Sequence, residues 1–204
     1  MGGFKPMGYN GRDVIYSFKI VICGANAVGK TCLFNRYCFN SFDFDTSPTI
    51  GINFHSVHIK INLKENPNQQ KENFVVNSIF DFGGQERFKP LLPRFIEGAN
   101  GALLVFDLVN RLTFNQLDFW YDQIIKYASN PDIPILLVGS KSDLLDKTIS
   151  SDIVPNSLIQ EYRKVHKLEG FYRTSSLENY NVLEVFKELN DIMLRKLHIP
   201  YVVA

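Results

Sequence analysis

The chain has 204 residues, 45% of them hydrophobic and 21% charged, which is typical of one globular domain with a substantial core. A formal net charge of +1 argues against a nucleic-acid partner, because such proteins normally carry a broad excess of positive charge. Apolar runs such as "GALLVF" are too short to cross a membrane, and the N-terminus lacks the apolar stretch of a signal peptide. The sequence therefore predicts a cytoplasmic protein.

Three segments are expected along the chain. Residues 1–13 are rich in glycine and predict a flexible tail, residues 14–199 form the domain, and residues 200–204 are a short C-terminal tail. The cysteines lack the spacing of metal ligands and are expected to be free thiols: Cys23, Cys32 and Cys38. Because none of them is near the C-terminus, we expect no direct lipid anchor in this chain.

The first chemical motif is "GANAVGKT", residues 24–31, between the strand-like run "SFKIVICG" and the helix-like stretch "KTCLFNRYCF". The pattern G-x-x-x-x-G-K-[ST] at such a junction predicts a loop whose backbone N–H groups surround a phosphate at the helix N-terminus. In this loop Lys30 would reach the β- and γ-phosphates, and the Thr31 hydroxyl would bind Mg²⁺. The nucleotide contacts expected from the loop are Asn26, Ala27, Val28, Gly29, Lys30, Thr31 and Cys32.

The rest of the chain alternates between strands and helices. The runs "GINFHSVHIKINL" and "ENFVVNSIFDF" are expected to pair as antiparallel strands through the polar turn "KENPNQQK". There follow strand "GALLVFDL", a helix over 113–128, strand "IPILLVGS", a helix over 156–166, strand "GFYRTS" and a helix over 182–197. This order predicts an α/β fold with a six-stranded, mostly parallel sheet, one antiparallel edge strand, and helices on both faces.

Two further stretches are expected to complete a triphosphate site at the carboxyl ends of the strands. In "IFDFGGQERF", Asp81 can hold Mg²⁺ through water, Gly84 can turn an N–H toward the γ-phosphate, and Gln85 can orient a water. In "DTSPTIGINF", Thr49 can place its hydroxyl on Mg²⁺ and its N–H on the γ-phosphate. The expected metal ligands are Thr31, Thr49 and, via water, Asp81, and the expected catalytic residues are Gln85, Lys30 and Thr49.

The stretches "LLVGSKSD" and "RTSS" end two later strands and can recognise a base. Asp143 can accept two hydrogen bonds from one planar edge, which guanine offers through N1–H and N2–H₂ and adenine does not. The aliphatic stem of Lys141 would lie along the base, and N–H groups between Thr174 and Ser176 would meet a base carbonyl oxygen. Taken alone, "SKSD" is a weak signal, because a charged loop after a strand is usually just solvated.

In this order the motifs "GANAVGKT", "SPTIGINF", "DFGGQERF", "SKSD" and "TSS" resemble those of the Ras superfamily of small GTPases, most closely its Rab branch, over residues 17–197. The resemblance implies a single P-loop GTPase domain that binds Mg²⁺ and GTP or GDP. It implies that Phe42 packs edge-on against the guanine. The base contacts that it implies are Ser140, Lys141, Asp143, Ser175, Ser176 and Leu177.

The resemblance also implies protein partners. Effectors, exchange factors and GTPase-activating proteins would bind around residues 46–54 and 80–96, and membrane attachment would run through a partner. The aromatic triad that meets effectors in Rab-like proteins corresponds to Phe54, Phe80 and Phe95, for which a role as core aromatics is the alternative.

Several positions depart from the family pattern. Asn26 and Ala27 stand where Ras has glycines, and the Asn26 side chain would crowd Gln85, which predicts slow intrinsic hydrolysis. Ser140 replaces an asparagine and is too short both to contact guanine and to tie the base loop to the phosphate loop. The loss of one or two hydrogen bonds predicts nucleotide binding weaker by about tenfold or more, with faster nucleotide release.

Further departures concern the first switch segment and the loops. No arginine or lysine lies between Asn40 and Ile50, so an arginine that accelerates hydrolysis must come from a partner. Thr46 stands where many relatives have tyrosine, and Leu177 where many have lysine. The turn over residues 64–71 is longer than usual, and is either a partner surface or an idle loop.

Three functions are therefore compatible with the residues. The favoured one is a GTP-hydrolysing molecular switch, in which the segments around Thr49 and Gln85 are ordered by Mg²⁺-GTP and released when the γ-phosphate is lost. The alternative is an interaction module that binds nucleotide with negligible turnover. A kinase that uses ATP would need an arginine-rich lid, which the sequence does not show.

Overall fold

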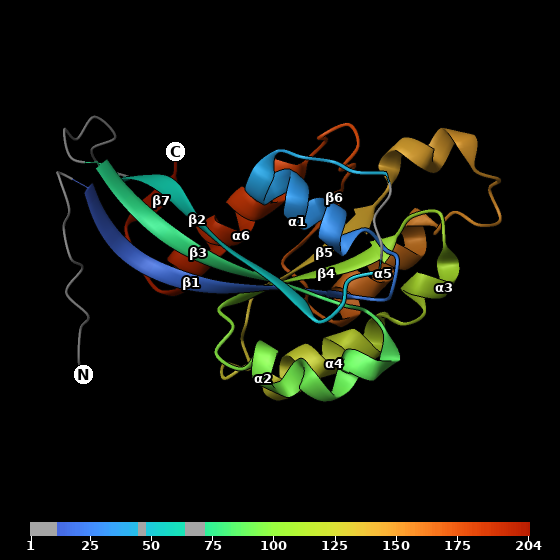
Figure 1. Ribbon diagram of the computed structural model, residues 1–204, viewed down its shortest axis with the longest axis horizontal. Coiled ribbons are helices and arrows are strands. Elements are labelled where there is room, and N and C mark those ends of the chain that lie inside the picture. Colours follow the sequence, from blue (N-terminus) through green and yellow to red (C-terminus); the bar gives the residue numbers. More distant parts are fainter. Residues whose placement is uncertain (1–11, 45–47, 64–71) are drawn as a thin grey trace.

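A computed structural model describes residues 12–44, 48–63 and 72–204 of the chain. Strands and helices alternate along most of it, as the sequence predicts (Figure 1). In chain order the elements are β1 (Arg12–Gly24), α1 (Lys30–Phe39), β2 (Ile52–Leu63), β3 (Glu72–Phe82), the 3₁₀ helix η1 (Glu86–Leu91), α2 (Leu92–Ile96), β4 (Gly101–Asp107), α3 (Arg111–Phe114), α4 (Leu117–Tyr127), β5 (Ile135–Ser140), the 3₁₀ helix η2 (Ser142–Lys147), α5 (Asn156–Val165), β6 (Gly170–Arg173), α6 (Val182–Lys196) and β7 (Tyr201–Val203).

The strands of the described chain form one sheet in the order β6-β5-β4-β1-β3-β2-β7. Strands β3, β1, β4, β5 and β6 run parallel to one another, whereas β2 is antiparallel to β3 and β7 is antiparallel to β2. This arrangement confirms the predicted α/β fold and the mostly parallel sheet. The sheet has seven strands rather than the six expected, so β2 is not its edge.

The additional strand, β7, lies in the segment expected as a C-terminal tail. It pairs with the far end of β2, where Ile61 lies opposite Val203. The backbone N–H of Val203 also donates to Asp191 Oδ1 of α6 at 2.8 Å, and the N–H of Ala204 donates to the Lys60 carbonyl at 3.0 Å. These bonds satisfy the polar groups of a run of three strand residues that would otherwise be too short to hold itself in place.

Two other boundaries differ from the prediction. Strand β1 begins at Arg12, where it pairs with Glu72 of β3, so the last two residues of the expected N-terminal tail belong to the sheet. The helix expected over 113–128 is two helices, α3 and α4, and α4 begins at Leu117. The Asn110 side chain accepts from the Leu112 N–H and caps α3, which therefore starts earlier than expected. Residues 1–11, Thr46 and the turn over 64–71 lie outside the described residues.

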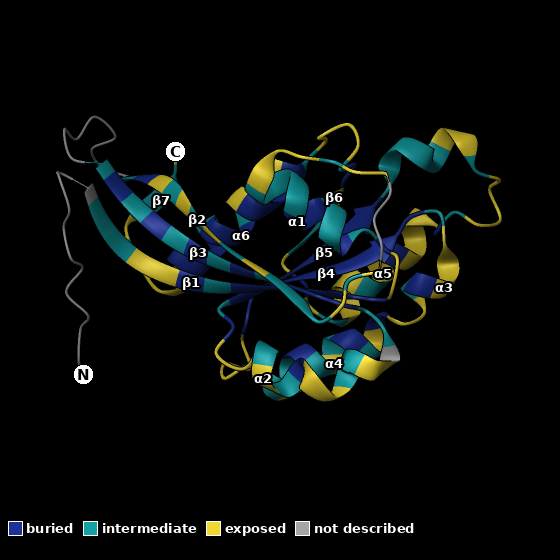
Figure 2. Cartoon of the chain, viewed as in Figure 1, coloured by how far each residue is buried: buried dark blue, intermediate teal, exposed yellow. Residues whose placement is uncertain are grey.

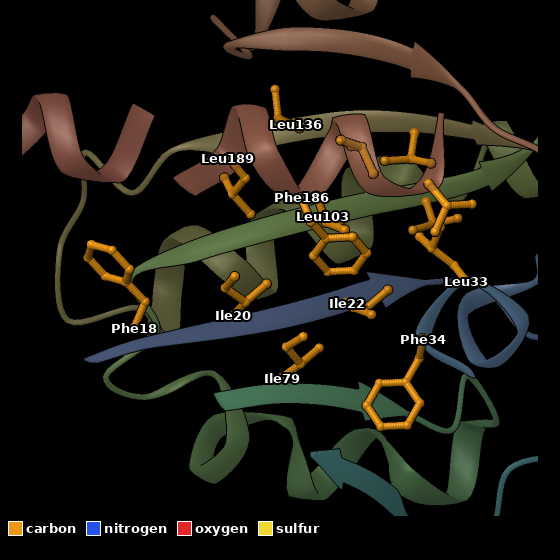
Figure 3. Packing of buried hydrophobic residues seen from close by; sticks show 14 of the residues in the cluster. Phe18, Ile20, Ile22, Leu33, Phe34, Ile79, Leu103, Leu136, Phe186 and Leu189 are labelled. Carbon is orange, nitrogen blue, oxygen red and sulfur yellow. The ribbon is translucent and has the colours of Figure 1, made fainter. Parts of the chain in front are cut away.

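The core lies in two layers, one on each face of the sheet. On one face α1 and α6 cover β1, β3 and β4, and Figure 3 shows Ile20, Ile22 and Phe186 gathered between the sheet and α6. On the other face α2, α4 and α5 bury a second cluster, which includes the fully buried Trp120. Strands β4 and β5 are buried along their whole length because both of their faces are covered (Figure 2).

This packing determines where functional residues can lie. The carboxyl ends of the parallel strands emerge at one edge of the sheet, where loops leave the rigid core. Every predicted motif follows one of these ends or faces it. Within the described residues, no helix is long and apolar enough to span a bilayer. The three cysteines are free thiols, as predicted.

Candidate nucleotide-binding site

The loop between β1 and α1 has the backbone of an anion site. Ala27 and Gly29 have left-handed conformations, with φ of 60° and 90°, and Gly29 directly precedes the helix. Right-handed and left-handed residues in alternation make a concave backbone whose N–H groups converge, and a helix N-terminus adds its partial positive charge. The predicted loop is therefore present as a preformed nest for phosphate.

Lys30 lies inside this loop. Its side chain is buried, and Nζ donates to the carbonyls of Gly24 at 2.8 Å and Ala25 at 2.7 Å. Burial lowers the pKa of Lys30 to about 8, while the nearby carboxylate of Asp81 acts in the opposite direction. A buried ammonium held by carbonyl oxygens is poorly compensated, so an anionic ligand in the loop would be bound favourably.

The three residues predicted to hold a metal ion converge, although they come from three different segments. Thr31 Oγ1 is 2.6 Å from Thr49 Oγ1 and donates to Asp81 Oδ2 at 2.6 Å. Asn53 Nδ2 also donates to Asp81 Oδ2, at 3.0 Å, while Asp81 Oδ1 is buried without a hydrogen-bond partner among the described residues. Burial is the main cause of the raised pKa of Asp81. Clustered hydroxyl and carboxylate oxygens, one of them unsatisfied, fit a hard cation such as Mg²⁺.

The glycine pair after β3 brings the segment around Gln85, here called the second switch segment, against the first switch segment around Thr49 and against the phosphate loop. Gly83 N–H donates to the Gly51 carbonyl at 3.0 Å. A Cβ atom on Gly84 would lie 2.6 Å from the Asn26 nitrogen and 2.7 Å from the Ala25 carbonyl oxygen. Only glycine permits this approach. Gln85 follows immediately and is half-buried at the start of η1.

The loops after β5 and β6, which the sequence predicts to recognise a base, are joined to each other by hydrogen bonds. Ser175 Oγ donates to Asp143 Oδ1 at 2.6 Å, and Glu178 N–H donates to the same serine hydroxyl at 3.1 Å. Ser142 N–H donates to the Thr174 carbonyl at 3.0 Å. Asp143 is thus oriented by its neighbour before any base binds.

Ser140 ties β5 to the phosphate loop. Its buried hydroxyl lies 2.5 Å from the Val28 carbonyl and 2.9 Å from the Phe106 carbonyl. One hydroxyl carries one hydrogen, so both acceptors compete for it and none is left for a base. This geometry agrees with the expectation that a serine cannot serve both the loop and the guanine.

Two polar residues near the site, Asp107 and Arg36, were not identified from the sequence. Lys141 Nζ pairs with Asp107 Oδ2 at 2.6 Å, and Asp107 is a buried carboxylate at the carboxyl end of β4. Arg36, in the last turn of α1, donates from Nε to the Ser176 carbonyl at 2.8 Å. An acid that ends a buried strand was a visible signal for Asp107. Nothing in the local sequence distinguished Arg36 from a charge at a helix end.

A cavity of about 300 Å³ opens among these elements. It is lined mostly by phosphate-loop residues together with both switch segments and Lys141. Residues predicted for nucleotide binding that do not line it are Val28, Phe42, Ser140, Asp143, Ser175, Ser176 and Leu177. The residues that do line it are Asn26, Ala27, Gly29, Lys30, Thr31, Cys32, Thr49, Phe82, Gly84 and Lys141.

Each member of the predicted aromatic triad packs against another aromatic ring. Phe54 and Phe80 lie with their ring centroids 4.9 Å apart, and Phe95 packs on Phe82 at 5.7 Å. Phe54 is 56% exposed, so the alternative of a core aromatic fails for this residue. Lys19 Nζ lies 4.9 Å from the centre of the Phe80 ring. Phe54 is therefore the exposed member of the triad, whereas Phe80 and Phe95 are partly buried and pack against the core cluster that contains Trp120, so the alternative of core aromatics holds in part for these two.

Comparison with known proteins agrees with this geometry. The family model of the Ras family matches residues 19–195. The chain therefore belongs to the Ras family, whose members are small GTP-binding GTPases.

Its similar proteins carry Rab names, as the sequence predicts. It is 34% identical to Ras-related protein RABA6a of Arabidopsis thaliana, over 90% of this chain and 70% of that protein. It is 35% identical to Ras-related protein RABA1b of the same plant, over 87% of this chain and 75% of that protein. It is also 35% identical to Ras-related protein Rab-11C of Dictyostelium discoideum, over 87% of this chain and 73% of that protein.

Proposed function

We propose that this protein is a Mg²⁺-dependent molecular switch that binds GTP through the site described above and hydrolyses it slowly to GDP. The observation that carries the proposal is the convergence of Thr31, Thr49 and Asp81, which brings the first switch segment to the oxygen cluster. A ligand that fills this cluster would hold Thr49 in place, and loss of the γ-phosphate would release it.

The chain's own residues divide the work. Lys30 and the N–H groups of the loop bind the phosphates and stabilise the charge that develops during phosphoryl transfer. Gln85 orients the attacking water, and the Asn26 side chain is expected to crowd Gln85 and so to slow this step. The backbone nitrogen of Asn26 would lie 2.6 Å from a Cβ atom on Gly84, the residue directly before Gln85. Mg²⁺, held by Thr31, Thr49 and, through water, Asp81, would neutralise charge on the β- and γ-phosphates when bound.

Guanine specificity is assigned to the joined base loops. Asp143, oriented by Ser175, accepts from the guanine N1–H and N2–H₂ groups, while the Ser176 N–H donates to the base carbonyl oxygen. Lys141, held by Asp107, lies along the base. Val28 and Ser140 contribute through the phosphate loop, and Phe42 and Leu177 flank the base.

Partners are proposed from the exposed switch surface. Effectors, exchange factors and GTPase-activating proteins would contact residues 46–54 and 80–96, where Phe54 and Ile50 are exposed. An activating protein would supply the arginine that the first switch segment lacks. Through such partners the protein would act at membranes in trafficking or signalling.

Hydrolysis under single-turnover conditions tests the proposal. Wild-type protein loaded with GTP and Mg²⁺ should form GDP measurably faster than Gln85→Leu protein, because the variant cannot orient the water. Gln160→Leu, an exposed glutamine of α5, is the matched control and should behave like the wild type.

The outcomes separate the alternatives. Equal rates for the wild type and Gln85→Leu, with GDP still bound tightly, would favour the interaction module without turnover. Preference for ADP over GDP would contradict guanine recognition by Asp143 and would favour an ATP-dependent enzyme.

A further inference from the structure

We propose that Arg36 is a positioning residue for guanine recognition, which links the start of the first switch segment to the base loop after β6. This inference rests on the proposed function, because it concerns how tightly the base is held. Arg36 lies in the last turn of α1 and is half-buried.

The first part of the argument is the contact with the base loop. Arg36 Nε donates to the Ser176 carbonyl at 2.8 Å, and Nη2 lies 3.4 Å from the Leu177 carbonyl. The N–H of Ser176 is the group proposed to meet the base oxygen. By holding the carbonyls of Ser176 and Leu177, Arg36 fixes the two peptide groups that directly follow the one presenting that N–H. Such hydrogen bonds from a charged donor are stronger than neutral ones.

The second part is the contact with the first switch segment. Arg36 Nη1 donates to the Asn40 carbonyl at 3.1 Å and lies 3.3 Å from Asn40 Oδ1. The guanidinium carbon is 6.0 Å from the centre of the Phe42 ring, which is proposed to pack on the guanine. A planar guanidinium can make these contacts together because its five N–H groups point in fixed, different directions.

One side chain therefore contacts two segments proposed to flank the same base: one lies four residues from Arg36 in the sequence and the other 140 residues from it. Movement of the segment at Asn40 and Phe42 would be transmitted to the Ser176 peptide through Arg36. We infer that an exchange factor that displaces the start of the first switch segment would loosen the base loop by this route.

A simpler role also explains an arginine at this position. A positive charge in the last turn of a helix interacts favourably with the helix dipole, and a side-chain donor can satisfy a terminal carbonyl. That role needs the positive charge but not the planar guanidinium with its several N–H groups, here called the fork, and it gives no reason for discrimination between guanine and adenine. The two roles therefore differ in what Arg36→Lys and base preference should show.

The test uses full-length Arg36→Lys and Arg36→Gln protein. Release of a fluorescent GDP analogue, with Mg²⁺ and excess unlabelled GDP, should be about tenfold faster for Arg36→Gln, as expected for the loss of charge-assisted hydrogen bonds. Arg36→Lys should recover only part of this change, because lysine keeps the charge but not the fork. Competition with GDP and ADP should show a smaller preference for GDP, since a loosened Ser176 N–H penalises adenine less.

The matched control is Arg163→Gln. Arg163 is exposed in the last turn of α5, which leads into the start of β6, at the sheet edge opposite the site. Its replacement should leave release and base preference unchanged. Thermal unfolding of each nucleotide-free variant separates loss of base contacts from general destabilisation.

Three results would overturn the inference. They are unchanged GDP release by Arg36→Gln, full recovery by Arg36→Lys, and an unchanged ratio of GDP to ADP affinity despite faster release. If the wild-type protein itself binds neither GDP nor GTP, the proposed function fails instead, and the two failures are thus distinguished.

Discussion

Replacement of Ser140 by alanine isolates the link between the base side and the phosphate side of the site. The substitution removes one hydroxyl that is 5% exposed and lies close to the carbonyls of Val28 and Phe106. It leaves the backbone of β5 and the size of the residue almost unchanged. The effect should therefore come from the lost hydrogen bond.

Its magnitude follows from the geometry. Because two acceptors share one hydrogen, a single bond is lost, and at least one buried carbonyl is left without its donor. The free energy of unfolding should fall by about 1–2 kcal/mol. Since Val28 belongs to the phosphate loop, the loop is also less well held, and GDP should be released on the order of five to ten times faster.

Two assays check Ser140→Ala. Urea unfolding of the nucleotide-free protein gives the change in stability, and displacement of a fluorescent GDP analogue gives the release rate. Ser151→Ala serves as the control, because the hydroxyl of Ser151 bonds to Asp152 on an exposed surface at 3.2 Å. A change in stability no larger than that of the control, within about 0.5 kcal/mol, together with unchanged release, would refute the reasoning.

Three further substitutions or modifications test neighbouring contacts. Gly84→Ala should leave GDP binding intact but prevent the second switch segment from packing on the phosphate loop, because the added Cβ would lie 2.6 Å from the Asn26 nitrogen. The variant should then be protected from proteolysis equally by GTP and by GDP. Asp107→Asn should speed GDP release by about tenfold, because Lys141 loses its partner at 2.6 Å; stopped-flow fluorescence measures the rate, and an unchanged rate would contradict a positioning role. Bound GDP should slow alkylation of Cys32, which lines the cavity, as followed by mass spectrometry; equal alkylation with and without GDP would place the nucleotide elsewhere.

The phosphate loop and the oxygen cluster of Thr31, Thr49 and Asp81 could be predicted because their residues stand in short, contiguous sequence patterns. Lys30 and Thr31 stand at fixed spacing from two glycines, and Asp81 ends an apolar run. Parallel strands end at one edge of a sheet, so a loop and helix start that follow one strand, with Thr31, were expected to lie near Asp81 at the end of another. The distance of 2.6 Å between them confirms that implication.

Contacts that depend on three-dimensional packing could not be predicted. Arg36 meets Ser176 because α1 and α6, the helix that follows this loop, pack on the same face of the sheet. The sequence near either residue gives no sign of this contact. The same holds for β7, since three residues of strand propensity are too weak a signal. Its place depends on Asp191, which accepts from Val203 N–H across the end of α6.

The attachment of β7 has a consequence for how the molecule can transmit a signal. A strand that slides by one residue turns all of its side chains to the opposite face, and β2 cannot slide without breaking its pairs with β7 and the bond from Ala204 to Lys60. Because Asp191 holds β7 on α6, and β7 pairs with residues 61–63 of β2, the antiparallel β2–β3 pair is fixed at the end far from the nucleotide site. We therefore expect a change at the nucleotide site to move residues 48–54, at the near end of β2, and not the far ends of β2 and β3.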